Sequence, residues 1–168
     1  MDYFGTDLAS AVERWWSETF VSVVEEKFPG ASLAVVVLRP DAAHDWRDPG
    51  AAGSVLLELR HGDGDTDPLV ANVHHKLHFT LRTGLDSMHA KRYLHLLEPG
   101  DFPHGGAVSH RGLVGGVSGL LEESDAWLAQ QVIDQLVAIR AGVAATAVAA
   151  SLAGAPGWSY LPNETPPA

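Results

Sequence analysis

The sequence has 168 residues, of which 46% are hydrophobic and 19% are charged, a balance typical of a globular chain with its own core. Its 11 lysines and arginines stand against 21 aspartates and glutamates, giving a formal net charge of −10. An acidic surface repels phosphate backbones and anionic lipids, which argues against nucleic-acid and membrane partners. There is no cysteine, so disulfides, thiolate catalysis and cysteine-ligated metals are excluded.

We expect neither an N-terminal signal peptide nor a membrane-spanning segment. The first seven residues are acidic and lack the basic segment and apolar core of a signal peptide. The longest apolar run, Ala141–Ala150, is too short to cross a bilayer. We therefore expect a soluble, cytoplasmic protein.

The first third of the chain predicts one helix and one strand. Apolar residues recur at helical spacing over residues 8–28, and the run 33–38 is typical of a buried strand. The polar segment 40–53 predicts a long loop. Its Trp46 either covers the sheet or acts as a lid over a site.

The middle of the chain predicts a strand followed by two helical segments. Residues 55–60 alternate in part and indicate a second strand. A helix is expected over 69–83, ended by Gly84, and a second helical segment over 87–97, with Ser87 as its cap.

The last third predicts a hairpin and a long helix. Segments 106–110 and 113–119 indicate two strands joined by a tight turn. Ser124 or Asp125 is expected to cap the next helix, which the alanine-rich stretch 141–155 either extends or follows.

Strands that come in hairpin-type pairs between helices favour an α+β fold over a doubly wound sheet. We predict a profilin-like three-layer sandwich, with an antiparallel sheet flanked by helices. Residues 1–140 are expected to form one domain, and 141–168 an alanine-rich helical extension with a flexible tail.

Short motifs between residues 67 and 139 add a family resemblance. The first is a lysine on a helix, followed by a glycine and a serine after it. A Gly-Gly pair then enters a strand, and Val-Gly and Ser-Gly-Leu lie in the next strand. An acidic residue opens the last helix. In this chain they are Lys76, Gly84, Ser87, Gly105-Gly106, Val114-Gly115, Ser118-Gly119-Leu120 and Asp125. Their order and spacing resemble the haem-degrading GlcG/HbpS-like domain family, in its branch of small stand-alone proteins.

The resemblance implies profilin-like subunits that assemble into homo-oligomers. Some members of that family are linked to haem binding or degradation, and others to unknown small molecules. This chain departs from the family pattern in its histidine-rich helix, its long loop over 40–53 and its alanine-rich extension.

Histidines on the predicted helix offer candidate metal ligands. His74 and His78 are four residues apart, so both lie on one helical face. That spacing suits a metal that finds a third ligand elsewhere, or one histidine can serve as an axial ligand of haem iron. The alternative is a solvated or interface face that titrates near neutral pH.

Basic and glycine residues complete the candidate ligand site. Lys76 and Arg82 lie near the histidines and either attract a carboxylate or compensate acidic helix ends. Gly105 and Gly106 allow the backbone to approach a ligand closely or simply serve the hairpin. We expect the ligand where the helix carrying His74, Lys76 and His78 meets this hairpin, at a subunit interface.

Three functions are compatible with these patterns. The first is an oligomeric small-molecule-binding protein of the GlcG/HbpS-like family, with haem as one candidate cofactor. The second is a haem-degrading or related redox enzyme. The third is a structural or partner-binding oligomer without a ligand.

Overall fold

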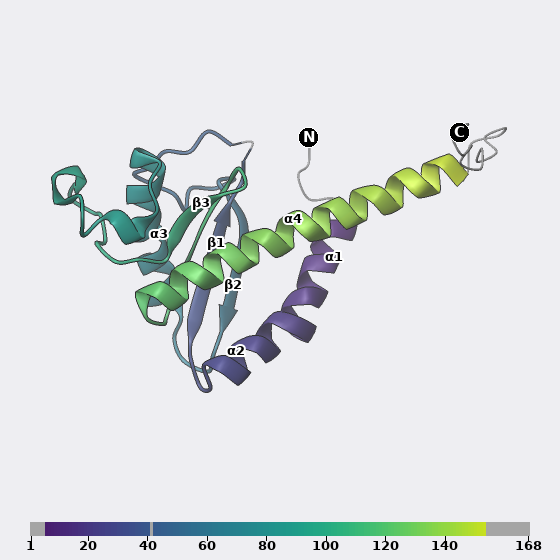
Figure 1. Ribbon diagram of the computed structural model, residues 1–168, viewed down its shortest axis with the longest axis horizontal. Coiled ribbons are helices and arrows are strands. Elements are labelled where there is room, and N and C mark those ends of the chain that lie inside the picture. Colours follow the sequence, from purple (N-terminus) through teal and green to yellow (C-terminus); the bar gives the residue numbers. More distant parts are fainter. Residues whose placement is uncertain (1–5, 41, 154–168) are drawn as a thin grey trace, which may run out of the picture.

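A four-stranded antiparallel sheet forms the middle layer of the molecule (Figure 1). The computed structural model describes residues 6–40 and 42–153. The strands lie in the order β2-β1-β4-β3, and their bounds are β1 Leu33–Leu38, β2 Val55–His61, β3 Ala107–His110 and β4 Leu113–Ser118. Helices cover both faces, so the predicted α+β sandwich with three layers is confirmed.

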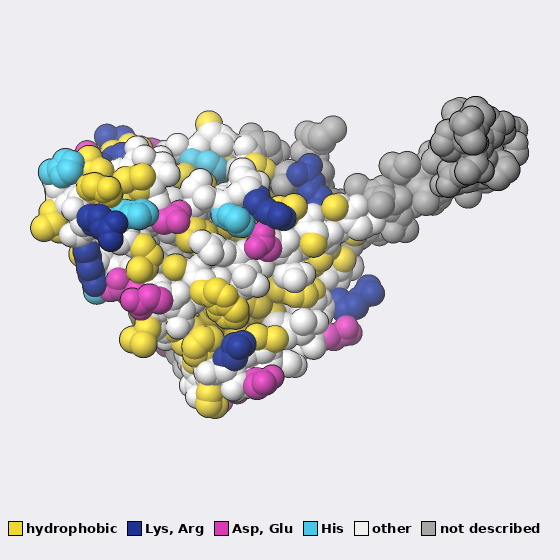
Figure 2. All heavy atoms as spheres, in the orientation of Figure 1, with side chains coloured by type: hydrophobic (Ala, Val, Ile, Leu, Met, Phe, Trp, Pro, Cys, Tyr) yellow, Lys and Arg dark blue, Asp and Glu magenta, His cyan; other side chains and the backbone are white. Residues whose placement is uncertain are grey.

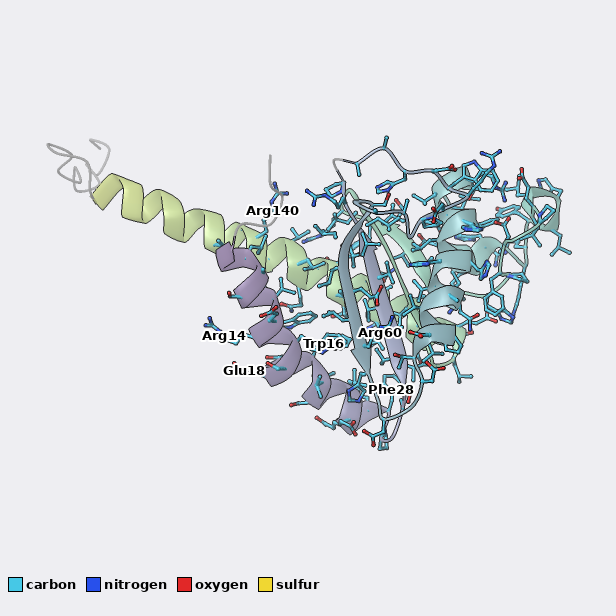
Figure 3. All side chains as sticks on the ribbon, turned by 180° about the vertical axis from the view of Figure 1, so that it is seen from behind. Arg14, Trp16, Glu18, Phe28, Arg60 and Arg140 are labelled. Atoms are coloured by element: carbon cyan, nitrogen blue, oxygen red, sulfur yellow. The ribbon has the colours of Figure 1, made fainter. Side chains whose placement is uncertain are left out.

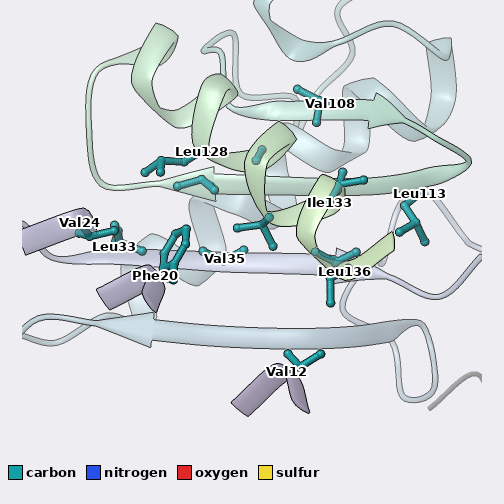
Figure 4. Close-up of a cluster of buried hydrophobic side chains, with 14 of the residues drawn as sticks. Val12, Phe20, Val24, Leu33, Val35, Val108, Leu113, Leu128, Ile133 and Leu136 are labelled. Atoms are coloured by element: carbon teal, nitrogen blue, oxygen red, sulfur yellow. The ribbon is translucent and has the colours of Figure 1, made fainter. Parts of the chain in front are cut away.

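The sheet divides the hydrophobic core in two. All six residues of β1 are buried, and they alternate between the two faces. Val35 and Val37 join the cluster formed with α1 (Thr6–Trp15), α2 (Val21–Lys27) and α4 (Glu122–Ala153), part of which Figure 4 shows. The cluster on the other face contains Ala34, Val36 and Leu38 of β1 and, from α3 (Asp67–Thr83), Val70, Val73 and Leu77.

The predicted first helix is interrupted. A π-helical turn at Trp16–Phe20 separates α1 from α2. Trp16 stacks on Phe20, with ring centroids 4.6 Å apart, and so adds aromatic surface to the core. Figure 3 shows Trp16 on the side facing the sheet, while Arg14 and Glu18 point away from it.

The helix expected over residues 87–97 is not formed. Two 3₁₀ turns, Ser87–His89 and Leu94–Leu96, stand in its place. Residues 91–95 are all exposed, so this segment has no continuous apolar face to bury. The Ser87 hydroxyl, expected as a helix cap, accepts the Ala107 N–H at 2.9 Å and so ties the segment to β3.

α3 and α4 begin and end close to the predicted positions. α3 ends at Gly84, which takes the left-handed conformation (φ 73°) that glycine adopts freely. α4 begins at Glu122 instead of after Ser124 or Asp125. Asp125 therefore lies inside the helix, where its carboxylate turns back to the β4–α4 connection.

α4 continues without interruption through the predicted domain boundary at residue 140 to Ala153. Its C-terminal half projects beyond the sheet (Figure 1). The predicted tail, Pro156 to Ala168, lies outside the described residues. None of the helices in the described part combines the length and hydrophobicity needed to cross a bilayer.

Candidate functional site

A buried ion pair joins the two helices on either side of β4. The Lys76 ammonium of α3 donates to Asp125 Oδ2 of α4 at 2.8 Å and to the Val117 carbonyl at 2.9 Å. The two side chains are 3% and 2% exposed. Because each charge lies out of water, each one depends on the other for compensation.

Asp125 also holds the connection between β4 and α4. Its second carboxylate oxygen accepts the Leu120 N–H at 3.0 Å. Burial raises the pKa of Asp125, although Lys76 and the backbone N–H groups of Leu120 and Gly119 act in the opposite direction. The carboxylate thus links α3, the end of β4 and the first turn of α4.

Gly106 packs directly on this pair. A Cβ at this position would lie 2.5 Å from the Val117 carbonyl oxygen and 2.8 Å from Lys76 Nζ, and its φ is +126°. Close approach and backbone conformation therefore both require glycine. The neighbouring Gly105 lies against Met88 and Glu122.

A cleft of about 270 Å³ opens beside the ion pair. It lies between α3, the segment that precedes β3, and the β4–α4 connection. Apolar and polar side chains converge on it, as in small-molecule sites. Its lining residues are Leu69, Asn72, Lys76, Phe102, His104, Ser118, Gly119, Leu120, Glu122 and Asp125.

A histidine–carboxylate pair lies at the same cleft. His104 Nδ1 is 2.7 Å from Glu122 Oε1, and Lys91 Nζ donates to the same oxygen. These contacts, the one with Lys91 above all, lower the pKa of Glu122 to about 2. Because Glu122 is ionised, it is an acceptor, so His104 carries a proton on Nδ1. In the neutral imidazole, Nε2 is then the lone-pair site.

The structure brings Lys76 and Gly106 of the predicted site together. The other predicted residues of α3 lie on a face of the helix that does not reach the cleft. His74, His78 and Arg82 do not line the cleft. His74 lies against Gly50, where a Cβ would be 2.6 Å from the imidazole. His78 meets the Trp46 ring edge-on at 6.3 Å, so Trp46 lies over α3 and not over the sheet.

Arg82 holds the segment that leads to the cleft. Its guanidinium donates to the Leu96 carbonyl at 2.7 Å and forms an ion pair with Asp101, whose side chain is 1% exposed. Phe102, which follows Asp101 directly, lines the cleft. Arg82 therefore helps to position Phe102, although Arg82 itself does not line the cleft.

The metal prediction has no third protein ligand in the described ranges. No group of three or more histidine or carboxylate side chains there could hold a metal ion. His74 Nε2 and His78 Nδ1 are buried and have no hydrogen-bond partner among the described residues. Metal binding by these two histidines stays a prediction.

Of the residues that line the cleft, the predicted ligand site contained only Lys76. Ser118, Gly119, Leu120 and Asp125 belong to the family motifs and not to that predicted site. Sequence reasoning missed the other five, which are Leu69, Asn72, Phe102, His104 and Glu122. His104 adjoins the Gly105-Gly106 motif, which was the one available signal. Its pairing with Glu122 spans 18 residues and depends on the path of the chain between them.

Crystal structures of other proteins share this fold. The Klebsiella pneumoniae protein ORFY, described by the DUF336 family model, gives a TM-score of 0.51 at 18% identity, covering 79% of this chain and 86% of ORFY. The Ybr137w protein gives 0.50 at 18% identity, covering 77% and 74%. A double mutant of Streptomyces reticuli HbpS gives 0.44 at 18% identity, covering 85% and 88%.

The sequence matches no protein-family model and no curated protein. At 18% identity, the likeness to ORFY and Ybr137w establishes a shared fold. The fold expected from the GlcG/HbpS-like resemblance is thereby confirmed.

Lys76→Met tests the buried ion pair. It leaves Asp125 buried without its cation, so we expect the free energy of unfolding to fall by about 3–5 kcal/mol. Lys91→Met, which removes an exposed partner of Glu122, should change it by at most about 1 kcal/mol. Denaturant unfolding measures both, and equal losses would contradict the special role of the buried pair.

The outer histidines predict a pH dependence of stability. Burial lowers the pKa of His74 and of His78 from the ordinary 6.5, so the unfolded chain binds protons first as the pH falls. Their contribution is therefore complete above pH 6.5 and is lost below it. In His74→Gln/His78→Gln, the decline of stability on acidification should be shallower than in the wild type.

Denaturant midpoints measured across this pH range test the histidine prediction. His95→Gln, at an exposed position in the segment after α3, serves as the control and should keep the wild-type slope. An unchanged slope in the double variant would show that these two imidazoles do not carry the effect.

Proposed function

We propose that this protein is a GlcG/HbpS-like small-molecule-binding protein whose ligand binds in the cleft beside Lys76 and Asp125. The observation that carries the proposal is the convergence of a buried ion pair and a histidine–carboxylate pair on one cleft. The fold shared with ORFY and Ybr137w supports it at the level of architecture. Ionisable groups arranged in this way are more frequent at binding sites than on ordinary surfaces.

The size and walls of the cleft support a small ligand. Its volume of about 270 Å³ lies just below the roughly 300–1,000 Å³ of clefts that enclose drug-sized molecules. Leu69, Phe102 and Leu120 offer apolar contact, while the Asn72 amide and the Ser118 hydroxyl offer hydrogen bonds. This combination suits a molecule with a flat apolar body and a few polar atoms.

The residues fit an enclosed haem poorly. His104 Nε2 is suitable for an axial bond to iron, but the cleft is small. Of the described residues that line it, Lys76 is the only lysine or arginine, and Asp125 already neutralises that charge. A haem carboxylate would therefore find no free cation in the cleft, and we favour a smaller ligand.

The projecting helix supports the oligomeric part of the proposal. Past Val143, which packs against the core, the end of α4 extends away from the sheet (Figure 1). The alanine-rich sequence there has small side chains that allow a second helix to approach closely. We propose that this end of α4 meets a second copy of the chain.

A fragment screen by ligand-observed NMR tests the proposed cleft. Asn72→Phe should fill the cleft and abolish the binding of fragments that the wild type retains. Ala71→Phe, on the exposed neighbouring position of α3, should leave their binding unchanged. Fragments that bind equally to both variants would place the ligand elsewhere, and native mass spectrometry of the same samples would report the subunit count.

Haemin titration tests the exclusion of haem from the cleft. We expect no Soret shift that depends on His104. His104→Gln and, as the matched control, His110→Gln should give the same spectra as the wild type, because His110 pairs with Asp134 instead of lining the cleft. A Soret shift lost in His104→Gln and kept in His110→Gln would establish haem as the ligand.

A further inference from the structure

We infer that the cleft selects an uncharged, planar small molecule whose hydroxyl or N–H group donates to Nε2 of His104. This inference rests on the proposed function and narrows it from a binding cleft to a class of ligand. Four features of the described residues carry it: a fixed tautomer, an open acceptor, paired charges and an aromatic wall.

The tautomer of His104 is fixed by its neighbours. Glu122 Oε1 lies 2.7 Å from His104 Nδ1 and also accepts a hydrogen bond from Lys91. A carboxylate that is ionised under ordinary conditions can only accept, so it holds the imidazole proton on Nδ1. In the neutral imidazole, the other nitrogen, Nε2, then offers a lone pair and no proton.

The side chain that carries this lone pair lines the cleft and is 43% exposed. Among the described residues, Nε2 makes no hydrogen bond and is not one of the buried polar atoms. A ligand O–H or N–H therefore meets an acceptor that no protein group in these residues already uses, whereas a ligand acceptor meets only repulsion there.

The charges around the cleft are already paired. Lys76 is neutralised by Asp125, and Glu122 by Lys91. An anionic ligand would face two carboxylates, Glu122 and Asp125, while a cationic one would compete with the two lysines. A charged ligand of either sign would therefore disturb an ion pair that is already formed without it. An uncharged molecule binds at the lowest electrostatic cost.

An aromatic wall favours a flat ligand. The Phe102 ring lies 4.4 Å from the His104 imidazole, centroid to centroid, and both rings line the cleft. Aromatic faces bind flat apolar surfaces by stacking or edge contact. A planar ring that carries one hydroxyl can contact the aromatic rings and donate a hydrogen bond to His104 Nε2 at the same time.

Phenol and anisole form a matched pair of probes for this inference. They share a flat ring, but anisole has no hydroxyl proton. In amide and imidazole NMR titrations near neutral pH, we expect wild-type protein to bind phenol about tenfold more tightly than anisole, the usual scale of one hydrogen bond to an otherwise unpaired group. His104→Phe, which keeps a ring and removes the acceptor, should erase this preference, while His110→Phe should retain it.

The outcomes separate this inference from the proposed function. Equal binding of phenol and anisole, or tighter binding of benzoate than of phenol, would overturn the selection by His104. If Asn72→Phe still abolished the binding of these probes, the cleft itself would stand as the binding site. Probe binding that Asn72→Phe leaves intact would overturn the proposed cleft, and with it the inference.

Discussion

The Lys76–Asp125 ion pair is the contact on which the arrangement of the site depends. It joins α3 to the first turn of α4 across the end of β4, and it is almost completely withdrawn from water. Desolvation makes such a pair a weak source of stability, because much of the attraction offsets the cost of burying two charges. Its effect is on position, because a shift of α3 against α4 would separate two charges that lie out of water.

Gly106 and the β4–α4 connection both contact the ion pair. Gly106 leaves room for the ammonium group, and the Leu120 N–H donates to the carboxylate. Leu120 lines the cleft together with Lys76 and Asp125, so the contacts of the ion pair also shape the cleft. Replacing the pair by apolar residues would remove these polar groups from the lining even where the fold survived.

The two faces of α3 have different roles. Lys76 lines the cleft, whereas the other face of α3 meets different segments. His74 lies against Gly50, His78 meets Trp46, and Arg82 pairs with Asp101. In the space-filling view, most of the visible histidines lie away from the C-terminal half of α4 (Figure 2). The face of α3 that carries His74, His78 and Arg82 thus holds the segments packed over it. Through Asp101, which Arg82 binds, and the adjacent Phe102, it also shapes the cleft.

Sequence patterns identified the strands, the end of α3 at Gly84 and the α+β class, because these follow from local periodicity and backbone preference. Lys76 and Gly106 were found through motif spacing, and they do lie together. His104 and Glu122 were missed because their contact depends on the irregular path from Leu97 to Gly106, which Arg82 helps to fix. The helix expected at 87–97 failed for a related reason, since its cap residue Ser87 bonds β3 instead.

The net charge of the chain and the charge at the cleft have different effects on binding. The net charge of −10 acts over the whole surface and disfavours extended anionic partners such as nucleic acids. At the cleft, two lysines offset the carboxylates of Asp125 and Glu122, so the local field is close to balanced. What distinguishes ligands there is hydrogen-bond direction and shape, and the lone pair of His104 is the group that sets the direction.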